Sequence, residues 1–267
     1  MRIHYMSDLH LEFGGQTINL PEGEVLVLAG DVTVARALDP AKAPGLRNEK
    51  TQARTQEFFE QASRNFAHVI YIAGNHEHYG GDISTTLAIL HEQLDFENVR
   101  IAENEAIQID GVTFLCSTLW TNMNGRDPAT IARVNRGVSD FRLITMDGRL
   151  FHAERSVDLH EASLAWLRAE AARRSNERIV VVTHHAPSLQ GLSHSFAGNG
   201  LNGAFASELE SLATEFPGIR SWIFGHTHLR KTFRVAGSIA ETTYRTNCAG
   251  YPGPALENFE ADTWFEV

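Results

Sequence analysis

The chain has 267 residues, of which 43% are hydrophobic and 21% are charged. This length and composition indicate a single globular domain over residues 1–267 and exclude wholesale disorder. The formal net charge of −10 disfavours a generic nucleic-acid or anionic-membrane binder, whose affinity depends on neutralising phosphates. The two cysteines, Cys116 and Cys248, lie far apart without a CxxC pair, which excludes a disulfide framework and a thiolate zinc site.

The N-terminal segment lacks a basic region followed by an apolar stretch, and no apolar run approaches the roughly 20 residues of a membrane helix. We therefore expect a cytoplasmic protein with no membrane partner. Histidine is unusually frequent, with 13 residues against 5 Tyr and 4 Met. Because histidine is the commonest metal ligand and a common proton carrier, clustering of these residues would indicate a site.

Six short apolar runs rich in β-branched residues have the length of strands. They are apolar throughout rather than alternating, which is typical of strands buried on both faces. The tail from 231 to 267 lacks a helical period and also predicts strands. The six runs cover residues 3–6, 25–29, 69–73, 112–116, 179–183 and 222–224.

Four segments between these runs carry apolar residues at helical spacing. Asp82 precedes one of them as an N-cap. Strands that alternate with helices predict an α/β fold. Residues 32–50 and 120–155 are expected to be irregular, the latter as an insertion over a site, and 186–203 as a polar loop. The periodic residues are Phe58, Ala62 and Phe66; Ile83, Leu87, Leu90 and Leu94; Leu164, Leu167 and Ala171; and Phe205, Leu209, Leu212 and Phe216.

Polar side chains follow five of the predicted strands. Because sites in open α/β sheets form at the carboxyl ends of strands, these side chains are expected to converge on one edge. Each motif alone has an ordinary explanation as a turn or a helix cap, but their joint occurrence favours a functional site. The residues are Asp8 and His10; Asp31; Asn75, His76 and Glu77; His184 and His185; and His226 and His228.

These residue types fit a binuclear metal centre. Imidazole, carboxylate and amide ligands together tolerate Mn, Fe, Zn, Co or Ni. The spacing Asp8-x-His10 places two ligands on one side of an extended segment, as does His226-x-His228. Asp31 has two oxygens and can bridge two ions, which at roughly 3.5–4 Å apart clamp a phosphoryl group and acidify a water. Glycines at 30, 74 and 225 let the chain turn tightly beside the ions.

The motifs resemble those of the calcineurin-like metallophosphoesterase superfamily over residues 3–228, and residues 247–252 resemble one bacterial branch of it. The resemblance implies a four-layer αββα sandwich of two mixed β-sheets flanked by helices. It also implies a metal-dependent hydrolase of small phosphate esters, a phosphodiesterase or phosphatase, that uses two metal ions and a metal-bound hydroxide. The matching motifs are Asp8-Leu9-His10, Gly30-Asp31, Gly74-Asn75-His76-Glu77, Thr183-His184 and Gly225-His226-Thr227-His228.

The resemblance also implies roles for individual residues. Asp31 is the bridging and catalytic carboxylate, and His76 protonates the leaving oxygen or stabilises the transition state. His184 is favoured over His185 as a ligand because it stands at the immediate end of its strand. The first metal takes Asp8, His10 and His228, and the second takes Asn75, His184 and His226.

The chain departs from the family at Val34, where many members have a second Asp three residues after Gly-Asp. Glu77 either serves in its place or, as we favour, caps a helix or pairs locally. His78 either lines the pocket or lies on the surface near a turn. Trp120 either stacks on substrate or packs in the core.

Substrate selection is expected in residues 118–155, where arginine fits phosphate oxygens. Three other functions remain as alternatives. A non-catalytic metal-binding scaffold is disfavoured because every ligand position is filled. A nuclease is disfavoured by the acidic charge, and a protein phosphatase by Val34. The six arginines of this segment are Arg126, Arg133, Arg136, Arg142, Arg149 and Arg155.

Overall fold

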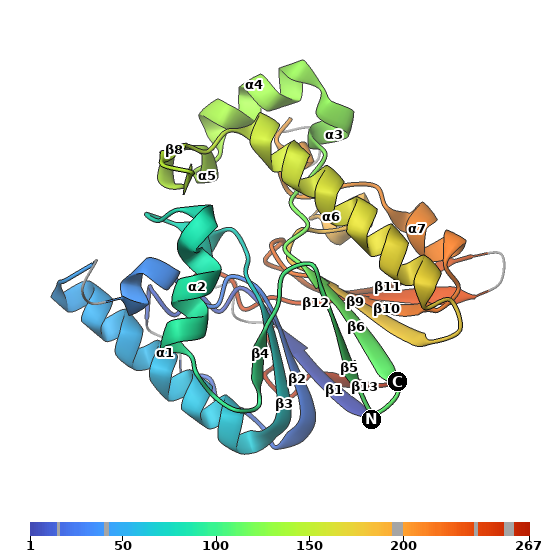
Figure 1. The fold of residues 1–267 in the computed structure, drawn as a ribbon, viewed down its shortest axis with the longest axis horizontal. Coiled ribbons are helices and arrows are strands. Elements are labelled where there is room, and N and C mark those ends of the chain that lie inside the picture. Colours follow the sequence, from blue (N-terminus) through green and yellow to red (C-terminus); the bar gives the residue numbers. More distant parts are fainter. Residues whose placement is uncertain (15–16, 40–42, 194–199, 238–239, 254–258) are drawn as a thin grey trace.

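The computed structural model describes the whole chain except residues 15–16, 40–42, 194–199, 238–239 and 254–258. Helices and strands alternate along most of the sequence, and the strands form two large sheets and one small hairpin (Figure 1). All six predicted apolar runs coincide with strands of the large sheets. The residues of the tail that the structure describes also contain strands, as expected.

The first sheet has the strand order β13-β1-β2-β3-β4. Strands β1 to β4 are parallel, and β13 pairs antiparallel with β1, so the sheet is mixed. The backbone N–H of Val267 donates to the carbonyl of Met1, which brings both ends of the chain to one edge. The bounds are β1 (Arg2–Met6), β2 (Gly23–Ala29), β3 (Phe66–Ile72), β4 (Val99–Ile101) and β13 (Trp264–Glu266).

The second sheet has the order β11-β12-β10-β9-β6-β5. Its four central strands are parallel, and the two edge strands are antiparallel to their neighbours, so this sheet is mixed as well. The bounds are β5 (Glu105–Ile109), β6 (Val112–Ser117), β9 (Arg178–Thr183), β10 (Ile219–Ile223), β11 (Arg230–Ala236) and β12 (Glu241–Asn247).

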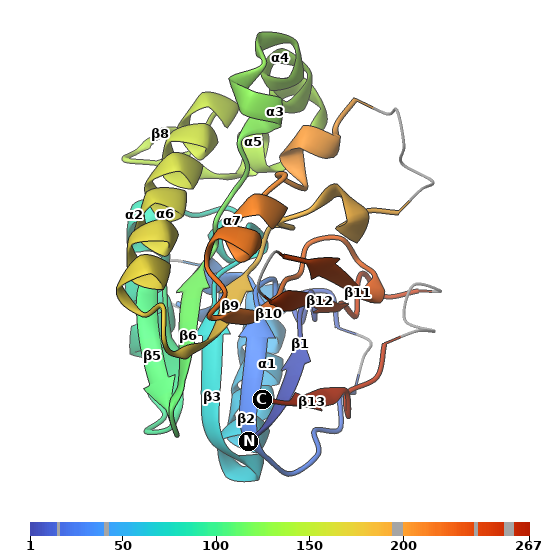
Figure 2. The ribbon, with the colours of Figure 1, turned by 90° about the vertical axis from the view of Figure 1, so that its right-hand side faces the viewer.

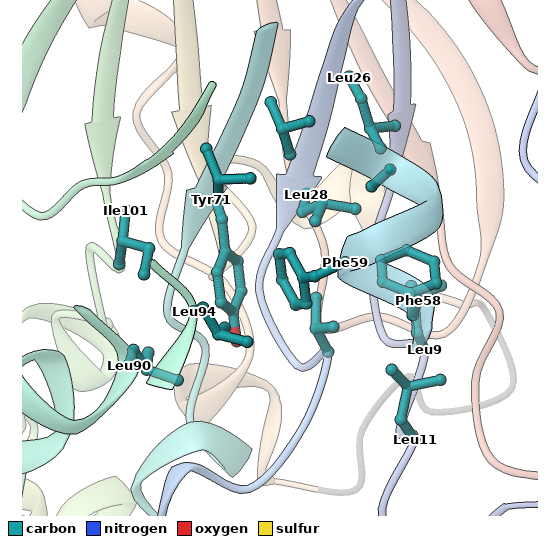
Figure 3. Close-up of a cluster of buried hydrophobic side chains, with 14 of the residues drawn as sticks. Leu9, Leu11, Leu26, Leu28, Phe58, Phe59, Tyr71, Leu90, Leu94 and Ile101 are labelled. Atoms are coloured by element: carbon teal, nitrogen blue, oxygen red, sulfur yellow. The ribbon is translucent and has the colours of Figure 1, made fainter. Parts of the chain in front are cut away.

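The two sheets pack face to face, with helices outside each of them. Along β2, Val25 and Val27 point into the core between the sheets, whereas Leu26 and Leu28 point to the helical side. Figure 3 shows the second set, where Leu28 and Tyr71 lie against Phe59 of a covering helix. The predicted αββα sandwich is therefore confirmed. Helices α1 (Leu46–Asn65) and α2 (Ile83–Gln93) cover the first sheet, and α6 (Ala153–Arg173) and α7 (Glu210–Glu215) cover the second.

The sequence suggested that the segment 120–155 is irregular, but in the structure it is mostly helical. Asp127 caps one helix by accepting from the backbone N–H of Thr130, and Pro128 occupies its first turn. Ile131 and Val134 of this helix are buried in a separate apolar cluster. These helices lie beyond one end of the sheets (Figures 1 and 2). The elements are α3 (Met123–Arg126), α4 (Pro128–Gly137), α5 (Asp140–Leu143) and the hairpin β7 (Thr145–Met146) to β8 (Arg149–Leu150).

Some predicted boundaries were wrong. Phe66 continues the helical period of the sequence, but α1 ends at Asn65 and Phe66 has an extended backbone that begins β3. Helix α7 starts at Glu210 rather than near Phe205. Asp82 does cap α2, accepting from the backbone N–H of Ser84. Four single-turn 3-10 helices occupy loops in the described part of the chain: η1 (Ala35–Leu38), η2 (His76–His78), η3 (Leu189–Gly191) and η5 (Asn202–Ala204).

Among the described residues, no helix combines the length and the apolar character that crossing a membrane requires. The two longest helices, α1 and α6, carry charged residues throughout and bury only one face.

Candidate metal centre

The polar residues that follow β1, β2, β3, β9 and β10 meet beyond the carboxyl ends of these strands. The structure brings together all seven predicted ligands, most of them fully buried. The potential ligand atoms form three overlapping groups, and within each group the atoms all lie within 4.8 Å of one another. The groups are Asp8, His10 and His228; His10, Asp31 and His76; and Asp31, His184 and His226.

The first predicted ligand set forms a compact triad. Nε2 of His10 lies 3.1 Å from Nε2 of His228, and the latter lies 3.3 Å from Oδ1 of Asp8. Two imidazole nitrogens and a carboxylate oxygen that face one another are a donor set that suits a first-row divalent cation.

The second set contains the amide of Asn75. Its Oδ1 lies 3.0 Å from Nε2 of His184, which in turn lies 3.1 Å from Nδ1 of His226. Asp31 faces both sets, with Oδ1 3.4 Å from His184 Nε2 and Oδ2 3.9 Å from His10 Nε2. Its two oxygens are therefore directed to different groups, which is the arrangement that a bridging carboxylate requires.

Five of the seven predicted ligands have a left-handed backbone. The φ angles are 55° for Asp8, 47° for His10, 54° for Asp31, 68° for His226 and 50° for His228. The Asp-x-His and His-x-His segments are thus not extended, and our reason for placing their side chains together was wrong although the placement holds. Such conformations are strained in non-glycine residues and concentrate at functional sites.

Two glycines allow the close approach of these segments. A Cβ atom at Gly30 would lie 2.5 Å from Nδ1 of His184, and Gly30 has a φ of 87°. A Cβ atom at Gly74 would overlap Oδ1 of Asp31. Both positions therefore exclude any side chain.

The buried carboxylates of the cluster stay ionised. Burial opposes the charge on Asp31, but His184, His76 and His10 hold the pKa of this carboxyl well below its usual value. Burial likewise opposes the charge on Asp8, and His228 lowers its pKa. Two buried anions in one cluster of imidazoles are a charge distribution that bound cations would compensate.

His76 lies between the ligands and the adjoining cavity. Its backbone N–H donates to Asp31 Oδ1, and its ring stacks on Tyr79 at 4.0 Å. Nε2 of His76 lies 3.1 Å from the hydroxyl of Tyr251. Burial opposes protonation of the ring, but the carboxylates of Asp31 and Glu12 raise the pKa of His76 to about 9, so the imidazole carries a proton at neutral pH.

Glu12 and Tyr251 are among the residues of this site that the sequence analysis missed. Glu12 is buried, and its Oε1 lies 3.2 Å from Nδ1 of His10 and 3.0 Å from Nδ1 of His76. Tyr251 packs its ring 4.6 Å from those of His10 and His228. Glu12 follows His10 by two positions but is not distinguished there from a surface acid, and Tyr251 lies in the segment 247–252, whose resemblance to one bacterial branch assigned it no role.

Glu77 pairs locally, as favoured. Its carboxylate accepts hydrogen bonds from the backbone N–H groups of Asp31, Val32 and Gly74 and from the hydroxyl of Tyr71. Glu77 therefore fixes the loops that carry the ligands and does not contact His76 through its side chain in any hydrogen bond of the described residues.

The aromatic residues beside the cluster pack in the interior. His185 does not join a ligand group; its Nδ1 donates to the carbonyl of Thr118, and its ring lies 5.0 Å from the ring of Trp120. Trp120 is buried against Phe151, so it is a core residue. His78 is also buried and stacks on Trp120 rather than lying on the surface.

A cavity of about 510 Å³ opens beside the ligand cluster. Among the described residues, its wall contains no Lys or Arg, and the six arginines of 118–155 lie elsewhere. Arg126, for example, pairs with Asp158 and Glu161 on the surface. The same segment does line the cavity, through residues 137–140. The wall comprises Asp31, Asn75, His76, Tyr79, Gly137, Val138, Ser139, Asp140, Leu192, Ser193, Leu201, Asn202, Phe205, His226, Thr227, His228 and Tyr251.

Residues 1–230 match the family model described as calcineurin-like phosphoesterase. The chain belongs to the calcineurin-like phosphoesterase family. It is accordingly a metal-dependent hydrolase of phosphoric esters, and the resemblance seen in the sequence motifs is confirmed.

Two individual proteins extend this comparison. An uncharacterised protein, L509 of Acanthamoeba polyphaga mimivirus, is 24% identical over 91% of this chain and 90% of its own length. The crystal structure of phosphopantetheinyl hydrolase (PptH) from Mycobacterium tuberculosis superposes with a TM-score of 0.64 at 17% identity, over 94% of this chain and 89% of that one. This second likeness concerns the fold.

Proposed function

We propose that this member of the family is a small-molecule phosphodiesterase or phosphatase with two metal ions. The observation that supports it most directly is the position of Asp31, whose oxygens face the His10 group on one side and the His184 group on the other. Asp8, His10 and His228 hold the first ion, and Asn75, His184 and His226 hold the second. The nitrogen and oxygen donors suit Mn, Fe, Zn, Co or Ni.

When bound, two such ions supply Lewis acidity at the phosphoryl oxygens and lower the pKa of a water nucleophile. The chain itself supplies the leaving-group proton. His76 Nε2 points towards the cavity beside Tyr251, and in the metal-free protein the carboxylates of Asp31 and Glu12 raise the pKa of its imidazole. In this proposal His76 protonates the leaving oxygen, a contribution typically worth about 10²–10⁴ in rate.

The cavity wall favours a small ester whose organic part is uncharged. Leu192, Leu201 and Phe205 provide apolar surface, and Asn202 and Ser139 provide neutral hydrogen-bonding groups. In this proposal residues 120–155 are part of the single domain and form one side of the cavity, to which 137–140 contribute. A polynucleotide, which needs many phosphate contacts, is disfavoured.

Two buried free cysteines accord with a reducing, cytoplasmic compartment, which we propose as the place of action.

The most informative experiment for the reaction is a kinetic panel on protein reconstituted with each candidate metal. It compares an aryl phosphate monoester, an aryl phosphodiester and cyclic nucleotides. Turnover of a phosphate ester with an uncharged aryl group is the expected result. Binding of two ions without turnover of any ester would instead support a non-catalytic scaffold.

A further inference from the structure

One carboxylate oxygen connects a predicted metal ligand with the predicted acid. Oε1 of Glu12 lies within hydrogen-bonding distance of Nδ1 of both His10 and His76. Glu12 is 7% exposed, and its second oxygen, Oε2, is buried without a hydrogen-bond partner among the described residues. A buried carboxylate with half of its acceptors unused is costly, which indicates that its position serves another purpose than local stability.

The two contacts fix which nitrogen of each ring is free. When Nδ1 donates to Glu12, Nε2 of His10 has its lone pair directed at His228 and Asp31, on the ligand side. For His76 the same donation leaves Nε2 towards Tyr251 and the cavity. A carboxylate that holds the far nitrogen of an imidazole sets both the tautomer and the orientation of the ring.

No other described carboxylate makes this contact with His76. Glu77 is committed to backbone donors and Tyr71, Asp31 binds the backbone N–H of His76 rather than its ring, and position 34 is a valine. Glu12 comes from a different segment, directly after the first ligand motif.

We propose that Glu12 is the positioning residue of this site, which holds His76 so that Nε2 faces the leaving oxygen and at the same time orients His10. The inference rests on the proposed function of His76. The hydrogen bond to His76 transmits the effect, and Glu12 itself contacts neither substrate nor reacting atoms.

The test combines Glu12→Ala, Glu12→Gln and His76→Ala with the double variant of Glu12→Ala and His76→Ala. Each is assayed at saturating metal on phenyl phosphate, which has a poor leaving group, and on 4-nitrophenyl phosphate, which has a good one. We expect Glu12→Ala to lower kcat on phenyl phosphate about 10–100-fold with a much smaller loss on the nitrophenyl ester. Adding it to His76→Ala should cost nothing further, and Glu12→Gln, which keeps an acceptor oxygen, should recover most of the rate.

A second readout is independent of turnover. Long-range ¹H–¹⁵N spectra of the metal-free protein should show a protonated Nδ1 on His76. In Glu12→Ala the Nδ1 proton should exchange faster with solvent, or the proton should shift from Nδ1 to Nε2. Glu177→Ala, which removes a carboxylate bound to Thr113 in the other sheet, is the control and should change neither readout. Equal losses on both esters, multiplicative effects with His76→Ala, or an unaltered His76 spectrum would overturn the role of Glu12. If the wild-type protein hydrolyses no ester, the proposed function fails while the spectra still test the hydrogen bond.

Discussion

Oδ1 of Asp140 accepts a hydrogen bond from Nδ2 of Asn75 at 2.9 Å. It also accepts from the hydroxyl of Tyr79 at 2.7 Å. Because an amide has a donor end and an acceptor end, the bond to Asp140 turns Oδ1 of Asn75 towards His184 and the second ligand set. Asp140 belongs to α5, so the helical segment beyond the sheets determines which atom of Asn75 is offered to a metal.

Replacing Asp140 by alanine should weaken the second metal position. Without its acceptor the amide of Asn75 can rotate, and loss of such a supporting contact typically costs about 10–100-fold in metal affinity. Calorimetric titration of the metal-free protein should show one tight and one weakened site. Asp140→Asn retains an acceptor oxygen and should behave nearly as the wild type, as should Asp158→Ala on the surface of α6. Two unchanged sites in Asp140→Ala would contradict this role.

Asp31→Ala should remove both ions, because its two oxygens face the two ligand groups. His228→Ala should release only the first ion, since His228 contacts Asp8 and His10 alone among the ligands. Elemental analysis of the purified variants after dialysis gives the stoichiometry. One full equivalent of metal retained by Asp31→Ala would show that the carboxylate is not shared.

Because the cavity wall contains no Lys or Arg among the described residues, it should discriminate against a second negative charge on the substrate. We expect 4-carbamoylphenyl phosphate to be hydrolysed with a kcat/KM at least about 10-fold above that of 4-carboxyphenyl phosphate, a nearly isosteric ester. Leu192→Arg places a cation in the wall and should reduce or reverse the preference. Leu189→Arg makes the same change three residues earlier, outside the wall, and should leave the ratio as it is. Equal rates for the two esters in the wild type would contradict this view of the cavity.

Asp82 gives a dependence of stability on pH that is separate from the metal centre. Partial burial opposes its charge, but hydrogen bonds from Gly148, Ser84 and Thr145 lower its pKa below the usual value near 4. A lowered folded-state pKa means that the stabilisation is complete above about pH 4 and is lost as the pH falls through the folded pKa.

Asp82→Ala should therefore lower the free energy of unfolding by about 1 kcal/mol near neutral pH, as is typical for loss of an N-cap. The difference from the wild type should shrink as the pH approaches about 3 in denaturant titrations. Alanine at the exposed Asp95, just beyond the end of α2, is the matched control and should have little effect. A difference that grows on acidification would contradict this account.

The core strands were predictable from sequence, as was the meeting of the predicted ligands at the carboxyl ends of strands, because both depend on local signals. Strands such as 25–29 are apolar on both faces, and a polar residue directly after such a strand can only lie at its carboxyl end. The helices of 120–155 were not predictable in this way. Their turns are short, and their stability depends on Asp127 as a cap and on burial of Ile131 and Val134 against a distant part of the chain.

The supporting contacts of the site were also beyond reach, for a different reason. Glu12 is close to His10 in sequence, but its partner His76 is 64 residues away. Asp140 lies 65 residues from Asn75. Nothing in the pattern around either carboxylate distinguishes it from a surface acid, so only the folded arrangement reveals which imidazole or amide it holds.

The hydrogen bond between Val267 and Met1 has a practical consequence for engineering. The two ends of the chain meet at the edge of the first sheet (Figure 1), whereas the predicted ligands follow the carboxyl end of β1. A short linker could join them into a continuous backbone, and new ends could then be opened at an exposed turn such as the one around Gly111 between β5 and β6. Such a circular permutant would keep every predicted ligand in place while moving the point of attachment for a surface or a fused protein.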